Sequence, residues 1–153
     1  MSVTYTQINV HCIFATNGRE NILTADIRQR LNRYVSGIIK SNEMFPLAVN
    51  GFVDHLHIFF ELPPTASLAH VIQIIKASSS KWMNENHFMP GKFSWQTGYA
   101  AFTYSRSQRD GVIQYIMNQE HRHANKTFRE EYLEFLKKYE IDFDDRYLFE
   151  FYD

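Results

Sequence analysis

The 153-residue sequence predicts one α+β domain, residues 1–153, with a ferredoxin-like β-α-β-β-α-β core, an antiparallel sheet and added C-terminal helices. Two observations predict this class. Apolar residues alternate in some segments, as in half-buried strands, and recur every three to four residues in others, as in amphipathic helices. The two kinds of segment also follow one another in the order of the split β-α-β fold. We find no internal repeat and no interdomain linker, so one core is expected.

The first half of the core is predicted from two alternating patterns and one helical pattern. Residues 5–16 alternate and predict a strand, and residues 24–40 have the apolar spacing of a helix. Residues 45–51 and 53–62 predict two paired strands. Between them, Asn50-Gly51 is a strong signal for a hairpin turn.

The second half continues the same order and then adds helices. Residues 67–86 predict a helix and residues 95–105 an aromatic-rich strand. Residues 109–122 predict a third helix, and a capping box at Thr127 opens a fourth over residues 128–140. The two core helices cover one face of the sheet. The other face must be covered by a second subunit or by the C-terminal helices, and the sequence leaves both open.

Composition limits the class of protein. The formal net charge of −1 argues against indiscriminate coating of nucleic acid. Nine acidic and four basic residues in residues 128–153 leave a net charge of +4 upstream, which fits either a local nucleic-acid site or ordinary solvated surface. A single cysteine, Cys12, excludes an internal disulfide, and no apolar run has membrane-spanning length, so we expect a cytoplasmic protein without a membrane partner.

The segment "VDHLHIFFEL" has two histidines on one strand. Because strand side chains alternate, His55 and His57 share a face while Leu56 points to the other. Such a pair is close enough to hold one metal ion, although solvated surface imidazoles are the alternative. A second His-x-His, His121 and His123, is expected on a helix, where residues two apart diverge by about 200°. We therefore expect the metal site at the strand pair alone.

The third predicted helix supplies the remaining chemistry. Tyr115 and Gln119 are four residues apart and lie on one helical face. Facing the histidine pair, the glutamine oxygen would complete a site for Mg²⁺ or Mn²⁺, with Glu120 as the competing ligand if the helix rotates. The tyrosine oxygen would be a nucleophile toward a phosphodiester. A phenol is only about a thousandth ionised at neutral pH, so a metal ion on the phosphate is needed to lower the barrier.

Four segments in order resemble the landmarks of single-tyrosine transposases of the HUH superfamily, which include the REP-associated tyrosine transposases. They are "DHLHIFFELPP", "IKASSSKW", "WQTGYAAFTYS" and "VIQYIMNQEHR". The resemblance runs from Tyr5 to Asn125. It implies a metal-dependent transposase that cleaves and rejoins single-stranded DNA, recognises hairpin ends, works as a homodimer and uses no nucleotide cofactor.

The resemblance also assigns residues. It implies that Tyr115 forms a 5′-phosphotyrosine and that His55, His57 and Gln119 bind the metal ion. Two other functions remain open. One is a domesticated, catalytically silent protein that binds single-stranded DNA hairpins, and the other is a nickase of the replication-initiator or relaxase type.

Other side chains have a functional and a structural interpretation. Asp54 could orient a ligand imidazole or serve the turn, and Glu61 could be an outer ligand or a solvated charge at the strand end. Trp82 and Trp95 could stack on bases, although core packing is favoured. Possible phosphate contacts are Lys76, Lys81, Arg106 and Arg109.

Overall fold

The computed structural model describes residues 3–18 and 22–152 and has the predicted β-α-β-β-α-β order. The core elements are β1 (Asn9–Ala15), α1 (Ala25–Ser41), β2 (Phe45–Gly51), β3 (His55–Glu61), α2 (Leu68–Glu85) and β4 (Ala100–Tyr104). The four strands form one sheet in the order β2-β3-β1-β4, and every neighbouring pair is antiparallel. This topology confirms the ferredoxin-like core.

The chain after the core forms short helices: η1 (Arg106–Gln108), α3 (Arg109–Met117), α4 (Gln119–Arg122), α5 (Phe128–Lys138) and η2 (Asp145–Tyr147). The prediction of one continuous helix over residues 109–122 was wrong, because the helix is interrupted at Asn118. The side-chain amide of Asn50, on β2, donates to the carbonyl oxygens of Ile116 and Met117 at 3.0 and 3.3 Å. The last turn of α3 is therefore tied to the sheet instead of continuing into α4.

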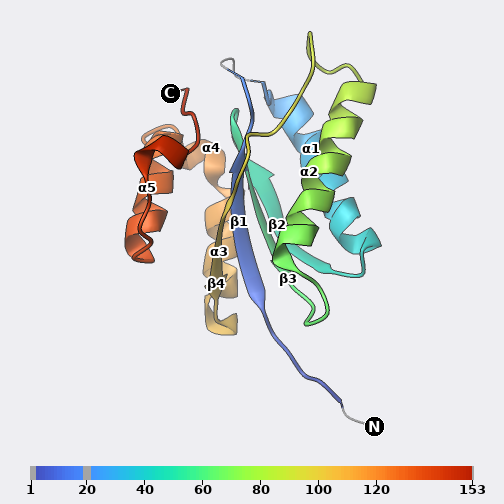
Figure 1. Ribbon diagram of the computed structural model, residues 1–153, viewed down its shortest axis with the longest axis vertical. Helices are drawn as coiled ribbons and strands as arrows, with labels where there is room; N and C mark the ends of the chain where they lie inside the picture. Colours follow the sequence, from blue (N-terminus) through green and yellow to red (C-terminus); the bar gives the residue numbers. More distant parts are fainter. Residues whose placement is uncertain (1–2, 19–21, 153) are drawn as a thin grey trace.

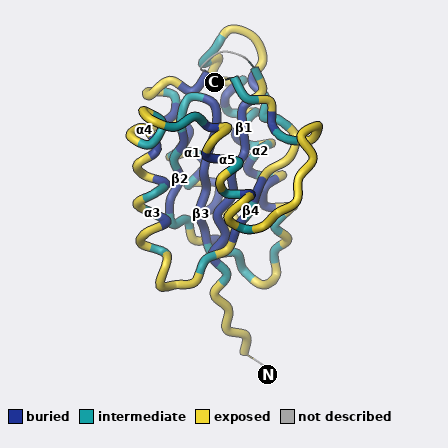
Figure 2. The backbone as a smooth tube through the Cα atoms, turned by 90° about the vertical axis from the view of Figure 1, so that its left-hand side faces the viewer, coloured by how far each residue is buried: buried dark blue, intermediate teal, exposed yellow. Residues whose placement is uncertain are grey.

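Helices cover both faces of the sheet (Figure 1). Helices α1 and α2 lie on one side, and α3, α4 and α5 lie on the other. The second face of the sheet is thus covered by the chain's own C-terminal helices, which is one of the two alternatives that the sequence left open. Figure 2 shows dark, buried strands behind helices whose outward surfaces are exposed. None of the described helices is long and apolar enough to cross a membrane.

Strand alternation separates an apolar core from the face that carries the histidines. Cys12, Phe14, Leu56 and Ile58 are fully buried in the main core, together with the apolar sides of α1 and α2. On the opposite face, Phe59 packs with Ala48 and with the α3 residues Val112 and Ile116 in a smaller cluster. Strand β3 is buried on both faces over residues 55–60. The side chains of His55, His57 and Phe59, which alternate with its core residues, are therefore shielded from solvent as well.

The hairpin between β2 and β3 differs from the prediction. Asn50 and Gly51 pair with His57 and Leu56 and so belong to β2, while the turn is formed by residues 52–54. A Cβ atom on Gly51 would lie 2.1 Å from the carbonyl oxygen of His55. Glycine is therefore required here for the close approach of two backbones, not for the turn.

Candidate metal and tyrosine site

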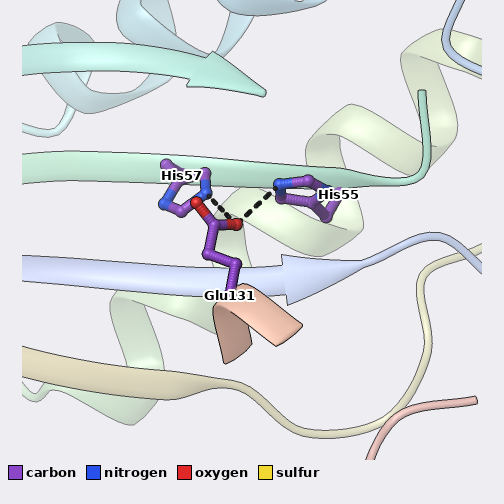
Figure 3. Close-up of side chains that lie close together, drawn as sticks. All are labelled: His55, His57 and Glu131. Atoms are coloured by element: carbon purple, nitrogen blue, oxygen red, sulfur yellow. Dashed lines mark hydrogen bonds and ion pairs between the residues drawn. The ribbon is translucent and has the colours of Figure 1, made fainter. Parts of the chain in front are cut away.

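The two histidines of β3 meet an acid from α5. His55 and His57 are fully buried, and the side chain of Glu131 reaches between them (Figure 3). Oε1 of Glu131 lies 3.3 Å from Nε2 of His55 and 3.2 Å from Nε2 of His57. The ligand atoms of these three residues all lie within 4.8 Å of one another, so they form a group that could hold a divalent ion.

Gln119, the first residue of α4, lies at the same point. Its Oε1 is 3.1 Å from Nε2 of His55, and its Nε2 donates to Oε2 of Glu131 at 3.1 Å. The glutamine oxygen thus faces the imidazole, as the sequence predicted. The competing residue, Glu120, is exposed and contacts Arg28 at 3.3 Å, away from the cluster.

His123 also contacts the cluster, although, among the described residues, the group whose atoms lie close enough to hold one ion consists of the strand pair and Glu131. Helix α4 ends at Arg122, and Nε2 of His123 lies 3.0 Å from Oε1 of Gln119 and 3.2 Å from Oε1 of Glu131. His121 is exposed. The two histidines diverge as expected on a helix, but the end of α4 directs one of them into the site.

Hydrogen bonds outside the cluster define which nitrogen of each ring faces inward. Nδ1 of His55 lies 2.8 Å from Oδ1 of Asp54, and Nδ1 of His123 lies 2.7 Å from the carbonyl oxygen of Lys126. Because these oxygens only accept, each Nδ1 carries the hydrogen. When its ring is neutral, each of these histidines therefore points the lone pair of Nε2 at the oxygens of Gln119 and Glu131. Because these lone pairs repel one another, a cation is needed between the nitrogens and the oxygens.

The spacing of the donor atoms fits a metal ion as that cation. Adjacent ligands of a six-coordinate ion at about 2.1 Å lie about 3.0 Å apart. The nitrogen–oxygen distances around Glu131 and Gln119 are 3.0 to 3.3 Å. Imidazole nitrogens mixed with amide and carboxylate oxygens suit Mn²⁺ better than Mg²⁺, which prefers oxygen ligands.

Electrostatics show what the same groups do without a metal ion. Burial alone would lower the pKa of His55, but its bonds to Asp54 and Glu131 and their charges raise that pKa to about 9. Burial lowers the pKa of His57 despite the charge of Glu131. Burial would raise the pKa of Glu131, yet the surrounding imidazoles hold it well below its ordinary value. A proton on His55 therefore balances the carboxylate in the metal-free chain.

His11 supports His57 from the neighbouring strand, a role that the sequence analysis missed. Nε2 of His11 lies 2.8 Å from Nδ1 of His57, and the rings stack with centroids 5.0 Å apart. Burial and the nearby His57 keep the pKa of His11 well below its ordinary value, so the ring is neutral. The available signal was its place in the alternating strand, on the face opposite Cys12.

Tyr115 reaches the cluster through Glu131. Its hydroxyl donates a hydrogen bond to Oε2 of Glu131, the oxygen that also accepts from Gln119. Its ring centroid lies 6.0 Å from that of His57. Burial, followed by the charge of Glu131, raises the pKa of the phenol. Tyr115 and Gln119 thus meet on one carboxylate although the helix between them is broken.

Glu131 was not predicted, because the resemblance ends before α5. The signal lay in the helix pattern: Glu131 is an acid on the same side as Phe128 and Phe135, at spacings of three and four residues. Phe128 stacks on His55 with ring centroids 3.9 Å apart, and Phe135 packs edge to face on Tyr115 with ring centroids 5.6 Å apart. A buried acid among apolar neighbours needs cationic or hydrogen-bonding partners, and the histidines supply them.

Most of the secondary candidates have structural contacts. Asp54 does contact His55, whereas Glu61 forms an ion pair with Arg109 at 2.9 Å outside the cluster. Lys76 donates to two backbone carbonyls near Trp95. The indole of Trp95 donates to buried Ser79 on α2, and Trp82 stacks on Tyr34, so both tryptophans pack within the protein.

A cavity of about 470 Å³ lies beside Tyr115. Tyr115 and Glu131 line it, and its rim is formed by exposed residues of η1 and α5, including Ser107, Gln108 and Lys138. The complete lining is Tyr104, Ser107, Gln108, Gly111, Val112, Tyr115, Arg122, Glu131, Glu134, Phe135 and Lys138. The cavity thus connects solvent with the phenol at the edge of the buried cluster.

The chain combines a β-α-β-β-α-β core with a buried histidine pair on the sheet and a tyrosine from the helix that follows. These features define a protein of the HUH single-tyrosine class. The family model described as "Transposase IS200 like" matches residues 4–119, more than half of the chain. The chain therefore belongs to the IS200-like transposase family. No curated protein is similar enough to match it.

Two solved structures share the fold. One protein, assigned as a transposase in Deinococcus radiodurans R1, is 23% identical with a TM-score of 0.61. The match covers 78% of this chain and 96% of that one. The other, a REP-associated tyrosine transposase bound to a REP hairpin, is 15% identical with a TM-score of 0.57. That match covers 80% of this chain and 73% of the other, and at these identities the likeness concerns the fold.

Proposed function

We propose that the protein is a metal-dependent single-strand DNA transposase that cleaves and rejoins DNA through a 5′-phosphotyrosine on Tyr115. Membership of the IS200-like transposase family supports DNA processing. The observation that carries the proposal is the contact of Tyr115 with Glu131, because the same carboxylate touches the imidazoles of His55 and His57. Nucleophile and candidate ligands thereby share one cluster within one chain.

The proposed ligands are His55, His57 and Gln119, with Glu131 as an added acidic ligand. Asp54 and His11 orient the two imidazoles from behind. A bound Mn²⁺ or Mg²⁺ would neutralise charge on a non-bridging phosphate oxygen. The carboxylate holds the phenol beside the ligand atoms and so fixes the direction from which Tyr115 attacks.

The proposed reaction exchanges one phosphoester for another. Oη of Tyr115 attacks the phosphorus, the tyrosine oxygen–phosphorus bond forms, and the bond from phosphorus to the 3′ oxygen breaks. The phenolic proton is released to water, and the leaving 3′ oxygen takes a proton from water, so that no proton is gained or lost overall. A free 3′-hydroxyl reverses the step without a nucleotide cofactor, because the phosphotyrosine keeps the energy of the bond.

The proposed substrate is single-stranded DNA with hairpin ends. The solved REP-associated relative is bound to a REP hairpin, which supports the same class of partner here. Assembly as a homodimer stays a prediction from the family resemblance. Because Tyr115 contacts the cluster of its own chain, each subunit of the dimer would carry a complete site. Light scattering measures the oligomeric state directly.

End-labelled hairpin oligonucleotides test the proposal. With Mn²⁺, a single strand should yield an upstream fragment with a free 3′-hydroxyl and a downstream fragment that is linked to the protein through its 5′ phosphate. A chelator or His57→Ala should remove both products, because the ligand set is incomplete. Perfect duplex cut faster than its isolated strand would contradict the transposase proposal. Binding of hairpins without cleavage would favour the silent DNA-binding protein instead.

A further inference from the structure

Arg122, the last residue of α4, is a cation beside the phenol. Its guanidinium carbon lies 4.2 Å from the ring centroid of Tyr115. Its Nε is buried and has no hydrogen-bond partner in the described part of the chain. By contrast, Arg28 contacts Glu120 and Arg109 contacts Glu61. A buried N–H of a cation without a partner is costly, which indicates that an anion belongs beside it.

The cavity next to Arg122 has the size and lining for a nucleotide. Its volume of about 470 Å³ lies within the range typical of small-molecule sites. The rings of Tyr104 and Phe135 line it, and Lys138 adds a second cation at the rim. The two acids of the lining are compensated, since Glu131 contacts the imidazoles and Glu134 pairs with Lys126 at 2.6 Å.

We propose that this cavity binds a nucleotide of single-stranded DNA, with Arg122 on a non-bridging oxygen of the scissile phosphate. The proposal rests on the proposed function, because Tyr115 must be the group that receives the phosphate. A guanidinium offers paired N–H donors that match phosphate oxygens, and this one lies over the phenol ring. Negative charge that develops on the tyrosine oxygen is stabilised by the same cation.

Single-stranded DNA is the favoured form of the ligand. An unpaired base can enter the cavity and stack on Tyr104 or Phe135, whereas a base within duplex is already stacked. Ser107 and Gln108, at the rim, offer a hydroxyl and an amide for hydrogen bonds to the nucleotide. The contact made by Arg122 therefore contributes to binding as well as to the reaction.

Binding without chemistry tests the subsite. In a Tyr115→Phe protein with chelator, fluorescence anisotropy measures the affinity for labelled single strands at several salt concentrations. Arg122→Gln should raise Kd by on the order of 10-fold or more, as expected for lost hydrogen bonds to a charged group. The salt slope should fall by about 0.7 for one lost phosphate contact. Arg122→Lys should lie between, because it keeps the charge but loses the paired donors.

Lys92→Gln is the matched control, because Lys92 is exposed and outside the cavity lining. It removes one positive charge and should change Kd less than twofold. Equal Kd and equal salt slope for Arg122→Gln and Lys92→Gln would overturn the subsite, and so would a parent protein that binds no single strand. If Arg122→Gln fails to fold, Arg122→Lys decides: several-fold weaker binding supports the subsite, and wild-type affinity overturns it.

The assay needs neither metal nor nucleophile, so the two proposals fail separately. Weak binding by Arg122→Gln together with no protein–DNA adduct from the wild type would keep the subsite and reject the transposase reaction. In the active protein, Arg122→Gln should lower the rate of adduct formation at saturating DNA while Mn²⁺ affinity stays unchanged. A variant that loses Mn²⁺ affinity instead would place Arg122 in the support of the metal cluster and overturn the subsite.

Discussion

The two carboxylate oxygens of Glu131 have different partners. Oε1 faces the Nε2 atoms of His55, His57 and His123, whereas Oε2 accepts from Tyr115 and Gln119. One side chain therefore joins the candidate ligands to the candidate nucleophile. We therefore expect metal binding to depend on the charge of Glu131 and on the tautomers of the neighbouring imidazoles.

Removing the charge of Glu131 should weaken the metal site. Glu131→Gln keeps the shape but loses the negative charge that faces the imidazoles, so Mn²⁺ affinity should fall by at least about 10-fold. Titration calorimetry measures this affinity. Glu130→Gln, on the exposed side of the same helix turn, is the control and should bind like the wild type. Equal affinity in both variants would remove Glu131 from the ligand set.

Asp54 should act through the tautomer of His55. In Asp54→Asn the new amide can donate to Nδ1, which moves the ring hydrogen to Nε2 and blocks the lone pair that faces Gln119. We expect Mn²⁺ affinity to fall by about 10–100-fold, as for other partners behind metal ligands. Electron paramagnetic resonance of free Mn²⁺ reports the change. An unaltered affinity would mean that Asp54 serves the turn alone.

Local periodicity explains which site residues could be predicted. His55 and His57 share a face because strands alternate, and that relation needs no tertiary information. The four-residue spacing of Tyr115 and Gln119 predicted that they lie close together, but the helix is broken at Asn118, and both side chains meet on Glu131 of α5. His11, His123 and Glu131 come from other elements, and only the packed fold brings them to the same point.

At the scale of elements, the β2–β3 hairpin determines where His55 starts its strand. Gly51 lies so close to the backbone of His55 that any added side chain must displace it. The sequence predicted both strands correctly but placed the turn two residues early, because Asn-Gly is a common turn signal. Contact of Asn50 with the end of α3 keeps that residue in the strand, and such a contact cannot be read from local sequence.

Two glycine substitutions should have opposite effects. Gly51→Ala should lower the free energy of unfolding by about 1–3 kcal/mol or more, because its Cβ would overlap a backbone oxygen. Gly37→Ala, inside α1 with open space around the added Cβ, should raise it by up to about 1 kcal/mol. Urea denaturation measures both. A stable Gly51→Ala protein with intact Mn²⁺ affinity would contradict the close approach described for the hairpin.

At the scale of the whole molecule, the chain covers both faces of its own sheet, and α5 brings Glu131 to the candidate metal ligands His55 and His57. The order and type of the core elements could be predicted because each has its own hydrophobic period. The position of α5 over the histidines could not, since it depends on aromatic contacts such as Phe128 on His55 and Phe135 on Phe102. Metal binding and folding should therefore be linked.

Mn²⁺ should stabilise the folded protein. At a free concentration of 100 times Kd, binding adds about 2.7 kcal/mol to the free energy of unfolding. For a chain of this size that corresponds to a rise in Tm of roughly 5–11 °C. Differential scanning calorimetry should show the rise in the wild type and none in His57→Ala. An equal rise in both proteins would place the bound ion away from the histidine pair.

The most direct test of the central claim is to locate the covalent bond. The protein is incubated with pooled single-stranded hairpin oligonucleotides and Mn²⁺, denatured, digested and mapped by mass spectrometry. We predict a nucleotide adduct on Tyr115 that is absent with chelator and absent in Tyr115→Phe, which should still bind the oligonucleotides. An adduct on another residue, or strand cleavage that persists unchanged in Tyr115→Phe, would contradict the account.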